Sequence, residues 1–228
     1  MPALLNTDLL STAGTEPGCR FLAEGYLPLP DLLTPDGLDV LRGEARALEA
    51  AAQRRDFEMG CMDDSPRHMT TLGGHVIAEK SDLIPGLYQD PRLRQLLRRI
   101  SGQDITTVPD LLERHVLNIL HRVGDTHGAH TDDHPYALVI FLEAPEDPAD
   151  GGLAHFAPGA DSLHDLDTGQ ARTAHHRAGD AYLLRSDTTA HRVTPHARPG
   201  LRRTVLNFAY TTPAAHPLST PSAAELYG

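Results

Sequence analysis

The chain contains no tryptophan and very little cysteine or lysine. Among its 228 residues there are two cysteines, Cys19 and Cys61, and a single lysine, Lys80. Two thiols cannot build a disulfide framework, so we interpret them as free thiols in a reducing compartment. The composition therefore does not favour a small secreted protein held together by disulfides.

Long apolar runs and basic clusters are also missing. The longest strongly apolar run, Ala137 to Leu142, is far shorter than the roughly 20 residues that a membrane-spanning helix needs. The N-terminal residues lack the basic start of a secretory signal. The formal net charge of −11 offers no basic surface for nucleic acid or an anionic membrane. We expect a cytoplasmic protein without these partners; monomer and homodimer both remain open.

The length and the 40% apolar content suit one domain with a real core. We expect a single domain, 1–228, in which residues 1–110 are helical and rich in loops. Residues 111–212 would form a β-sheet core, and residues 213–228 a C-terminal tail or lid, between which composition does not decide.

Two helices are predicted in the N-terminal part. Thr34 is a typical N-cap before a proline and a helical apolar pattern, and a second pattern begins after Asp90 and ends at Gly102. Between them, Met59 to Ser81 looks irregular, which in a compact domain favours a mobile or functional loop.

After residue 110 the apolar period changes from 3.6 to 2. Glycine, proline, aspartate and asparagine separate the strand-like runs, and no helical pattern intervenes. Such spacing predicts an antiparallel sandwich or jelly roll. The predicted strands are 114–122, 136–144, 153–158, 180–186 and 202–210.

Histidine and carboxylate side chains gather in this strand-rich part. In an extended segment residues i and i+2 point the same way, so His130 and Asp132 could hold one metal ion together. This short motif alone is weak, because the composition gives about one such match by chance. His191, near a later strand-like run, supplies a candidate third ligand.

A candidate anion site follows along the chain. Arg202 could bind a carboxylate through two charge-assisted hydrogen bonds, and Thr204 lies on the same strand face. The order and spacing of all five residues are much less expected by chance than any single pair.

The segments GAHTDDHPYALVIFLEAP and GDAYLLRSDTTAHRVTPHARPGLRRTVLNFAY resemble the iron(II)/2-oxoglutarate-dependent oxygenases. They are most similar to a small bacterial clade of free-amino-acid hydroxylases and radical amino-acid halogenases. The resemblance covers roughly residues 60 to 212. It implies a cupin-like double-stranded β-helix (jelly roll), with Fe(II), 2-oxoglutarate and O2. His130, Asp132 and His191 would be the catalytic iron ligands, and Arg202 with Thr204 the 2-oxoglutarate anchor.

The same resemblance bears on the reaction. The halogenases of this clade carry glycine at the carboxylate position, which frees a coordination site for chloride, whereas this chain has Asp132. Because an anionic ligand and a halide would compete for one site, we expect hydroxylation of an unactivated C–H bond.

Four further residues match positions at which the clade holds its amino acid. Arg67 would bind the substrate carboxylate with help from His127, and Glu113 and Asp133 would receive ammonium groups. Two acids and an arginine suit a basic amino acid by charge complementarity. Lysine is the first expectation, followed by ornithine or arginine.

Other roles for these four residues remain open. Arg67 could pair with Asp63 or Asp64, Glu113 could be a solvated strand end, Asp133 could orient a ligand histidine, and His127 could be an ordinary turn residue. The lysine-specific members use aromatic groups near the C-terminus to close over substrate. This chain has no tryptophan, and Tyr210 and Tyr227 are the candidates for that task.

Two other functions compete with the oxygenase. The spacing of His130 and His134 is that of a zincin helix, but the glutamate after the first histidine is missing. A cupin-like barrel that keeps its metal and only binds a small molecule is the non-enzymatic alternative. A complete ligand triad beside a carboxylate anchor favours the oxygenase over such a binding protein, which needs neither.

Overall fold

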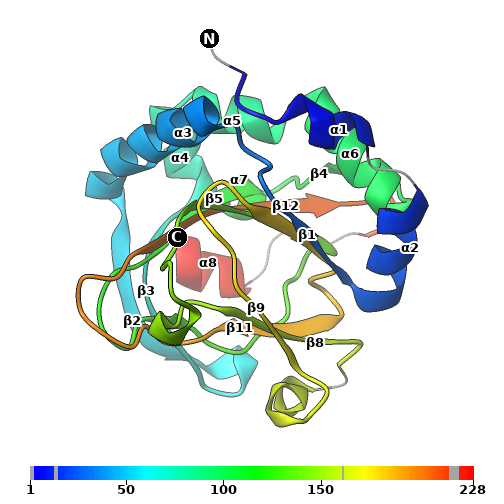
Figure 1. Ribbon diagram of the computed structural model, residues 1–228. Helices are drawn as coiled ribbons and strands as arrows, with labels where there is room; N and C mark the ends of the chain where they lie inside the picture. Colours follow the sequence, from blue (N-terminus) through cyan, green and yellow to red (C-terminus); the bar gives the residue numbers. More distant parts are fainter. Residues whose placement is uncertain (1–2, 13–14, 161, 216–220) are drawn as a thin grey trace.

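Two antiparallel β-sheets of unequal size form the centre of the protein (Figure 1). The computed structural model describes residues 3–12, 15–160, 162–215 and 221–228. The larger sheet has the order β1-β10-β7-β12-β5-β3-β2, with β4 paired to β12 and β6 to β3, and the smaller sheet has the order β11-β8-β9. The strands are β1 Tyr26–Leu29, β2 Gln53–Met59, β3 Ser65–Leu72, β4 Thr106–Thr107, β5 His115–Leu120, β6 Thr126–His127, β7 Tyr136–Glu143, β8 Ala154–Pro158, β9 Arg172–Ala174, β10 Ala181–Leu184, β11 Thr189–Val193 and β12 Arg203–Thr211.

The N-terminal helices lie on one side of the larger sheet and the smaller sheet on the other (Figure 1). Both predicted helices are confirmed: the Thr34 hydroxyl accepts a hydrogen bond from Gly37, the Asp90 carboxylate accepts one from Arg92, and Gly102 adopts the left-handed conformation. The α-helices are α1 Thr7–Thr12, α2 Thr15–Glu24, α3 Pro35–Leu48, α4 Gly74–Lys80, α5 Leu83–Tyr88, α6 Pro91–Ser101, α7 Leu111–Arg114 and α8 Pro221–Tyr227.

Eight strand segments between residues 115 and 211 pair in a nested order. Counted along the chain, the first (β5) pairs with the eighth (β12), the third (β7) with the sixth (β10), and the fourth (β8) with the fifth (β9). The loop that follows the second strand (β6) bridges the seventh, β11, through His130 and His191. This pairing is that of a jelly roll, so the predicted double-stranded β-helix is confirmed.

Strand β7 does not show the apolar-polar alternation of a strand with one exposed face, because both of its faces are buried. Its even-numbered residues Leu138, Ile140 and Leu142 pack in the cluster that includes the helices, whereas Ala137, Val139 and Phe141 face the smaller sheet. A strand buried on both faces is apolar throughout. The helices therefore cover the outer face of the larger sheet, and its inner face lines the barrel.

The prediction that Met59 to Ser81 is irregular is wrong, since this segment contains a short 3₁₀ turn (Gly60–Met62), β3 and α4. The reason lies in β3, where Arg67 and Thr71 are each only 1% exposed. Polar side chains that point into a cavity remove the polar-apolar alternation by which a strand is detected. The N-terminal part also adds β1 and β2, which the helical prediction missed.

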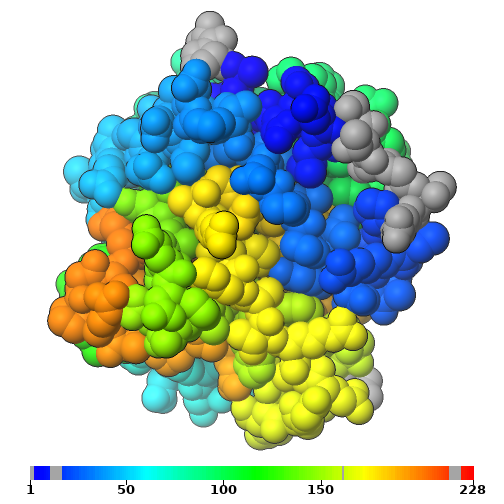
Figure 2. Space-filling view, viewed as in Figure 1, coloured from blue at the N-terminus to red at the C-terminus, as the bar shows by residue number. Residues whose placement is uncertain are grey.

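The C-terminal segment, left open as a tail or a lid, ends in α8. This helix contacts α7 and β3, and the Thr71 hydroxyl donates a hydrogen bond of 3.0 Å to the carbonyl of Leu226. Seen in space-filling form from the same side, the blue N-terminal elements and the yellow segments around β8 and β9 cover much of the surface (Figure 2). Within the described ranges, no helix is long and apolar enough to cross a membrane.

Candidate metal centre

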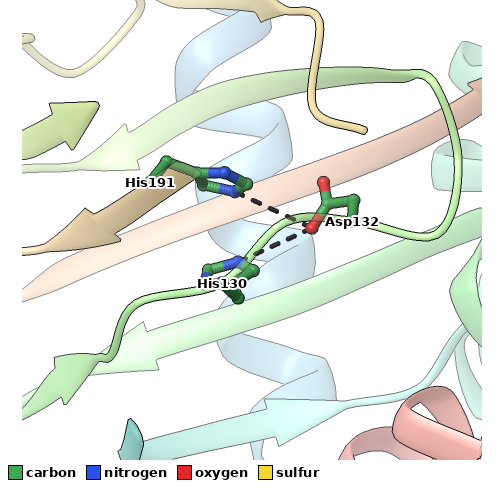
Figure 3. Close-up of side chains that lie close together, drawn as sticks. All are labelled: His130, Asp132 and His191. Carbon is green, nitrogen blue, oxygen red and sulfur yellow. Dashed lines mark ion pairs between the residues drawn. The ribbon is translucent and has the colours of Figure 1, made fainter. Parts of the chain in front are cut away.

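Three side chains from two distant segments converge inside the barrel (Figure 3). His130 and Asp132 lie on the loop after β6, and His191 lies on β11. The backbone amides of His130 and His191 each donate to the other's carbonyl at 2.9 Å. This reciprocal pair aligns the two histidines, and Asp132 follows two residues after the first.

The ligand atoms of this cluster lie close enough to share one ion. Asp132 Oδ1 is 3.6 Å from His130 Nε2 and 3.7 Å from His191 Nε2, and all three candidate ligand atoms lie within 4.8 Å of one another. Two imidazoles and one carboxylate are the donor set typical of non-haem iron(II) sites. The set fits such an ion.

Backbone carbonyls orient both imidazoles. His130 Nδ1 is 2.7 Å from the Gly128 carbonyl, and His191 Nδ1 is 2.9 Å from the Thr189 carbonyl. Because a carbonyl only accepts, each Nδ1 carries the hydrogen and each Nε2 presents a lone pair to the cluster. Both histidines are therefore prepared as ligands before any ion arrives.

The electrostatics of the cluster suit a cation. Burial lowers the pKa of His130 well below its usual value, and the neighbouring His127 and His191 add to this effect. Burial also raises the pKa of Asp132, which His191 opposes. A neutral His130 beside the half-buried carboxylate of Asp132 leaves a site whose charge a divalent cation would compensate.

Close packing fixes the ligand loop against β3. The Gly128 amide donates to the Pro66 carbonyl at 2.8 Å, and a Cβ at position 128 would lie 2.5 Å from that oxygen. Glycine is required here because any side chain would collide with the backbone. The contact holds the loop beside the strand that carries Arg67.

Two cavities flank the cluster, and they share His127, His130 and Asn207. The first lies between the sheets and is largely aromatic and aliphatic; the second lies under α8 and is more charged. The first cavity, here called the inner pocket, is lined among others by Tyr26, Asn118, Phe156, Tyr182, His191 and Arg203. The second, the outer pocket, is lined among others by Met59, Arg67, Glu113, Asp132, Asp133 and Tyr227.

The expectation that Arg202 and Thr204 face the metal cluster is wrong. Arg202 donates to Glu143 at 2.6 Å and to Glu49 at 2.5 Å, and the Thr204 hydroxyl donates to Glu143 at 2.6 Å. None of these contacts reaches either pocket. Successive residues of a strand point to opposite faces, so the inward position belongs to the neighbouring Arg203.

Arg203 is a buried cation without a carboxylate partner among the described residues. It is 3% exposed, its Nε has no hydrogen bond, and its guanidinium lies 4.9 Å from the centre of the Phe141 ring. Burial lowers its pKa. The sequence analysis missed Arg203 because Arg202 is directly before it. A shift of one residue in the predicted alternation exchanges the inward and outward faces of the strand, so either arginine could have faced inward.

Arg67 is the corresponding buried cation of the outer pocket. Its guanidinium donates to the Ser65 hydroxyl at 2.7 Å and lies 3.4 Å from Met59 Sδ. Its Nε has no partner, and no ion pair joins it to an acid of the described chain, so the alternative pairing with Asp63 or Asp64 is not found. Burial lowers its pKa.

The two acids proposed for the substrate already have partners. Glu113 Oε2 is 3.0 Å from His134 Nε2, and burial raises the pKa of this carboxyl against the opposing effect of His134. Asp133 is more exposed and accepts from the Ser222 hydroxyl on α8 at 2.6 Å. Glu113 is thus not a solvated strand end, and both acids line the outer pocket.

His127 is not an ordinary turn residue. It lies on β6 and stacks on His130 with ring centres 4.1 Å apart, and its buried Nε2 has no hydrogen bond to any described residue. Its register partner on β3 is Arg67. His127 therefore stands between the metal cluster and the outer pocket.

The sequence analysis also missed Asn207, whose side chain lines both pockets and whose buried Oδ1 has no hydrogen-bond partner in the part of the chain that the structure describes. Its inward position follows from the same alternation along β12 that places Arg203. Tyr227, one of two aromatic candidates near the C-terminus, lines the outer pocket, whereas Tyr210 packs against Tyr88 in the core.

The zincin arrangement is not formed. His130 and His134 lie on an irregular loop rather than a helix, and His134 points to Glu113 instead of joining the metal cluster.

Solved structures with the same fold are numerous, at low identity. The epimerase SnoN from nogalamycin biosynthesis, described as non-heme and alpha-ketoglutarate dependent, is 18% identical over 96% of this chain and 89% of its own, with a TM-score of 0.69. HygX from Streptomyces hygroscopicus, solved with nickel and 2-oxoglutarate, is 15% identical over 86% of both chains, with a TM-score of 0.62. A Pseudomonas putida prolyl-4-hydroxylase is 15% identical over 90% of this chain and 98% of its own, with a TM-score of 0.57.

A comparison with curated proteins gives no match. The family model described as halogenase D, HalD, matches residues 12–225. This range includes the three candidate metal ligands, the inner pocket and the lining of the outer pocket except Leu226 and Tyr227. The chain therefore belongs to the halogenase D family.

Proposed function

We propose that this protein is an Fe(II)/2-oxoglutarate-dependent oxygenase that hydroxylates a small, free basic amino acid. One observation carries the proposal: the metal cluster lies between two pockets, each with a buried arginine that has no acidic partner in the described chain. A buried cation is unfavourable unless a ligand compensates it. Two such cations suit two anionic ligands, a co-substrate and a substrate.

His130, Asp132 and His191 would hold the iron. When bound, iron(II) supplies the coupling of 2-oxoglutarate decarboxylation to dioxygen-dependent attack on a C–H bond. The fold supports this assignment, as do the similar structures of SnoN with Fe3+ and alpha ketoglutarate and of HygX with nickel and 2-oxoglutarate. The chain contributes imidazoles that backbone carbonyls orient through Nδ1, and two pockets that flank the cluster.

Arg203 would bind a carboxylate of 2-oxoglutarate in the inner pocket. The flat guanidinium pairs with a carboxylate through two hydrogen bonds, and the aromatic wall excludes the water that would compete for it. This replaces the assignment of Arg202, whose guanidinium is already bound to Glu49 and Glu143.

Arg67 would bind the substrate carboxylate in the outer pocket, and His127 would help to place it. Glu113 and Asp133 would receive ammonium groups on the other side. One cation and two acids complement a zwitterion with an additional positive charge, so we propose lysine first, then ornithine or arginine. Tyr227 on α8 would close the aromatic side of this pocket.

Asp132 supports hydroxylation over halogenation, although the family is described as a halogenase. Its carboxylate stands at the cluster together with both histidines, at the place where a halide would have to bind. An anion and a carboxylate compete for one coordination position.

Succinate formation tests the proposal. The purified protein would be incubated with Fe(II), ascorbate and 2-oxoglutarate, with each of the twenty amino acids and ornithine, in the presence and absence of chloride. We expect a basic amino acid to stimulate succinate formation and to gain one oxygen atom from isotopically labelled dioxygen. A chlorinated product would show a halogenase instead, and the absence of stimulation across the panel would contradict an amino-acid oxygenase and favour the non-enzymatic cupin.

A further inference from the structure

A histidine outside the metal cluster is hydrogen-bonded to an acid of the outer pocket. His134 is 3% exposed, and its Nε2 lies 3.0 Å from Oε2 of Glu113. The two residues belong to different segments, the ligand loop and α7, and both line the outer pocket. A buried hydrogen bond between segments fixes the carboxylate more firmly than the short helix α7 would alone.

The backbone around His134 is itself held in place. The Ser186 hydroxyl donates to the His134 carbonyl at 2.9 Å, and the Ser186 amide donates to Pro135 at 3.1 Å. The same residue accepts from the Asp132 amide through its carbonyl at 2.9 Å. Ser186 is completely buried. One residue thus fixes both the metal ligand Asp132 and the histidine that holds Glu113.

Glu113 retains acceptor capacity toward the pocket. A carboxylate has two oxygens with about four lone-pair positions. Its Oε2 is occupied by His134, whereas its Oε1 has no hydrogen bond from any residue in the described ranges. This oxygen could accept a hydrogen bond from an ammonium group of a bound amino acid. Its position relative to the metal ligands is set by the loop that carries Asp132 and His134.

We propose that His134 is a positioning residue that fixes Glu113 as the acceptor for a substrate ammonium group and thereby selects which carbon faces the metal centre. The proposal rests on the proposed function, in that it takes the outer pocket to bind an amino acid. It adds the residue that sets the distance between the ammonium acceptor and the reacting position. Because the metal ligand Asp132 and His134 are only two residues apart on the same loop, the conformation of this loop sets the distance between Glu113 and the metal centre.

Two variants separate positioning from simple support of the fold. His134→Leu removes the donor, whereas His134→Gln keeps an N–H that can reach Glu113. His115→Phe is the matched control, because His115 is also buried but lines neither pocket. The amino-acid affinity would be measured by calorimetry on the iron- and 2-oxoglutarate-loaded protein without dioxygen. The probes are L-lysine, L-norleucine without the side-chain amine, and 6-aminohexanoate without the α-amine.

We expect His134→Leu to weaken L-lysine binding by about 10- to 100-fold, the range for loss of a charge-assisted hydrogen bond. It should also lose the preference for lysine over one of the two analogues, which identifies the ammonium that Glu113 receives. With dioxygen, the ratio of hydroxylated product to succinate should fall and the position of hydroxylation should spread. His134→Gln should restore most of the affinity, and His115→Phe should keep all of it.

Two results would overturn the proposal. One is a His134→Leu protein with wild-type affinity, product position and product-to-succinate ratio. The other is an equal loss in all three variants, which would show a general packing effect. If no amino acid stimulates the wild-type enzyme, the proposed function itself fails, and this outcome is distinct because it is read before any variant is made. Should another amino acid be the best substrate, it and its deaminated analogues replace the lysine series.

Discussion

The backbones of His130 and His191 pair with each other through two hydrogen bonds of 2.9 Å, although 60 residues separate them along the chain. This bridge brings two imidazoles to the same side of the barrel and leaves Asp132 beside them. The metal cluster is thus built on backbone pairing of the jelly roll, and the side chains need little rearrangement to bind an ion.

Loss of the carboxylate should weaken iron binding. We expect Asp132→Ala to reduce Fe(II) affinity by at least tenfold and to abolish hydroxylation, because two imidazoles alone hold the ion less firmly. Competition with a metal-binding dye would measure the affinity. Asp132→Gly in chloride should admit the halide and yield some chlorinated amino acid. The control is Asp187→Ala, since Asp187 pairs with Arg185 away from both pockets. Full activity of Asp132→Ala would refute the ligand assignment.

Replacement of Arg203 and replacement of Arg202 should have very different effects on the 2-oxoglutarate requirement. Arg203→Gln should raise the 2-oxoglutarate concentration needed for half-maximal rate by about 10- to 100-fold, since a charge-assisted contact to a carboxylate is lost. Arg202→Gln should leave that concentration within about twofold. It should instead lower the melting temperature by a few degrees, because Glu143 and Glu49 lose a partner. The reverse pattern would return the anchor to Arg202.

Arg67 should act on the amino acid and not on the co-substrate. We expect Arg67→Met to weaken amino-acid binding by about 10- to 100-fold while the 2-oxoglutarate requirement stays unchanged. Steady-state titrations of both compounds would show the difference. Arg92→Met is a suitable control, because Arg92 is exposed and pairs with Asp90, the N-cap residue of α6. An equal effect on both titrations would mean that the two pockets do not divide their ligands as proposed.

The buried His115 should make the protein sensitive to mild acid. Burial lowers its pKa in the folded state to about 4, whereas an unfolded histidine titrates near 6.5. Above pH 6.5 neither state binds the proton, and the group contributes nothing to the pH dependence. As the pH falls from 6.5 to 4, the unfolded chain takes up the proton first, so stability decreases, by up to roughly 3 kcal/mol.

Replacement of this imidazole tests that account. Both ring nitrogens of His115 are buried without a hydrogen-bond partner among the residues described, and the ring centre lies 5.5 Å from that of Tyr88. His115→Phe should therefore keep or increase stability at pH 7 and flatten the decrease toward pH 4. Urea unfolding at several pH values measures both effects. Parallel pH profiles for variant and wild type would show that another group causes the acid sensitivity.

Several helices and strands and the metal ligands of this protein could be predicted from short stretches of its sequence. Capping residues and helical periodicity marked α3 and α6, because such signals act within a few residues. The change to a period of 2 marked five of the eight strand segments of the jelly roll, β5, β7, β8, β10 and β12. The spacing of His130 and Asp132 with a distant histidine indicated the metal cluster. These features follow from backbone geometry, which neighbouring residues set.

Only the tertiary structure decided which arginine faces the inner pocket. Arg202 and Arg203 are chemically equivalent, and a strand directs neighbours to opposite faces, so burial on each side of the sheet made the choice. The same holds for β3, whose inward polar residues hid it, and for the contact of His134 with Glu113. Such relationships depend on which segments the fold places side by side, and no short stretch of sequence contains that information.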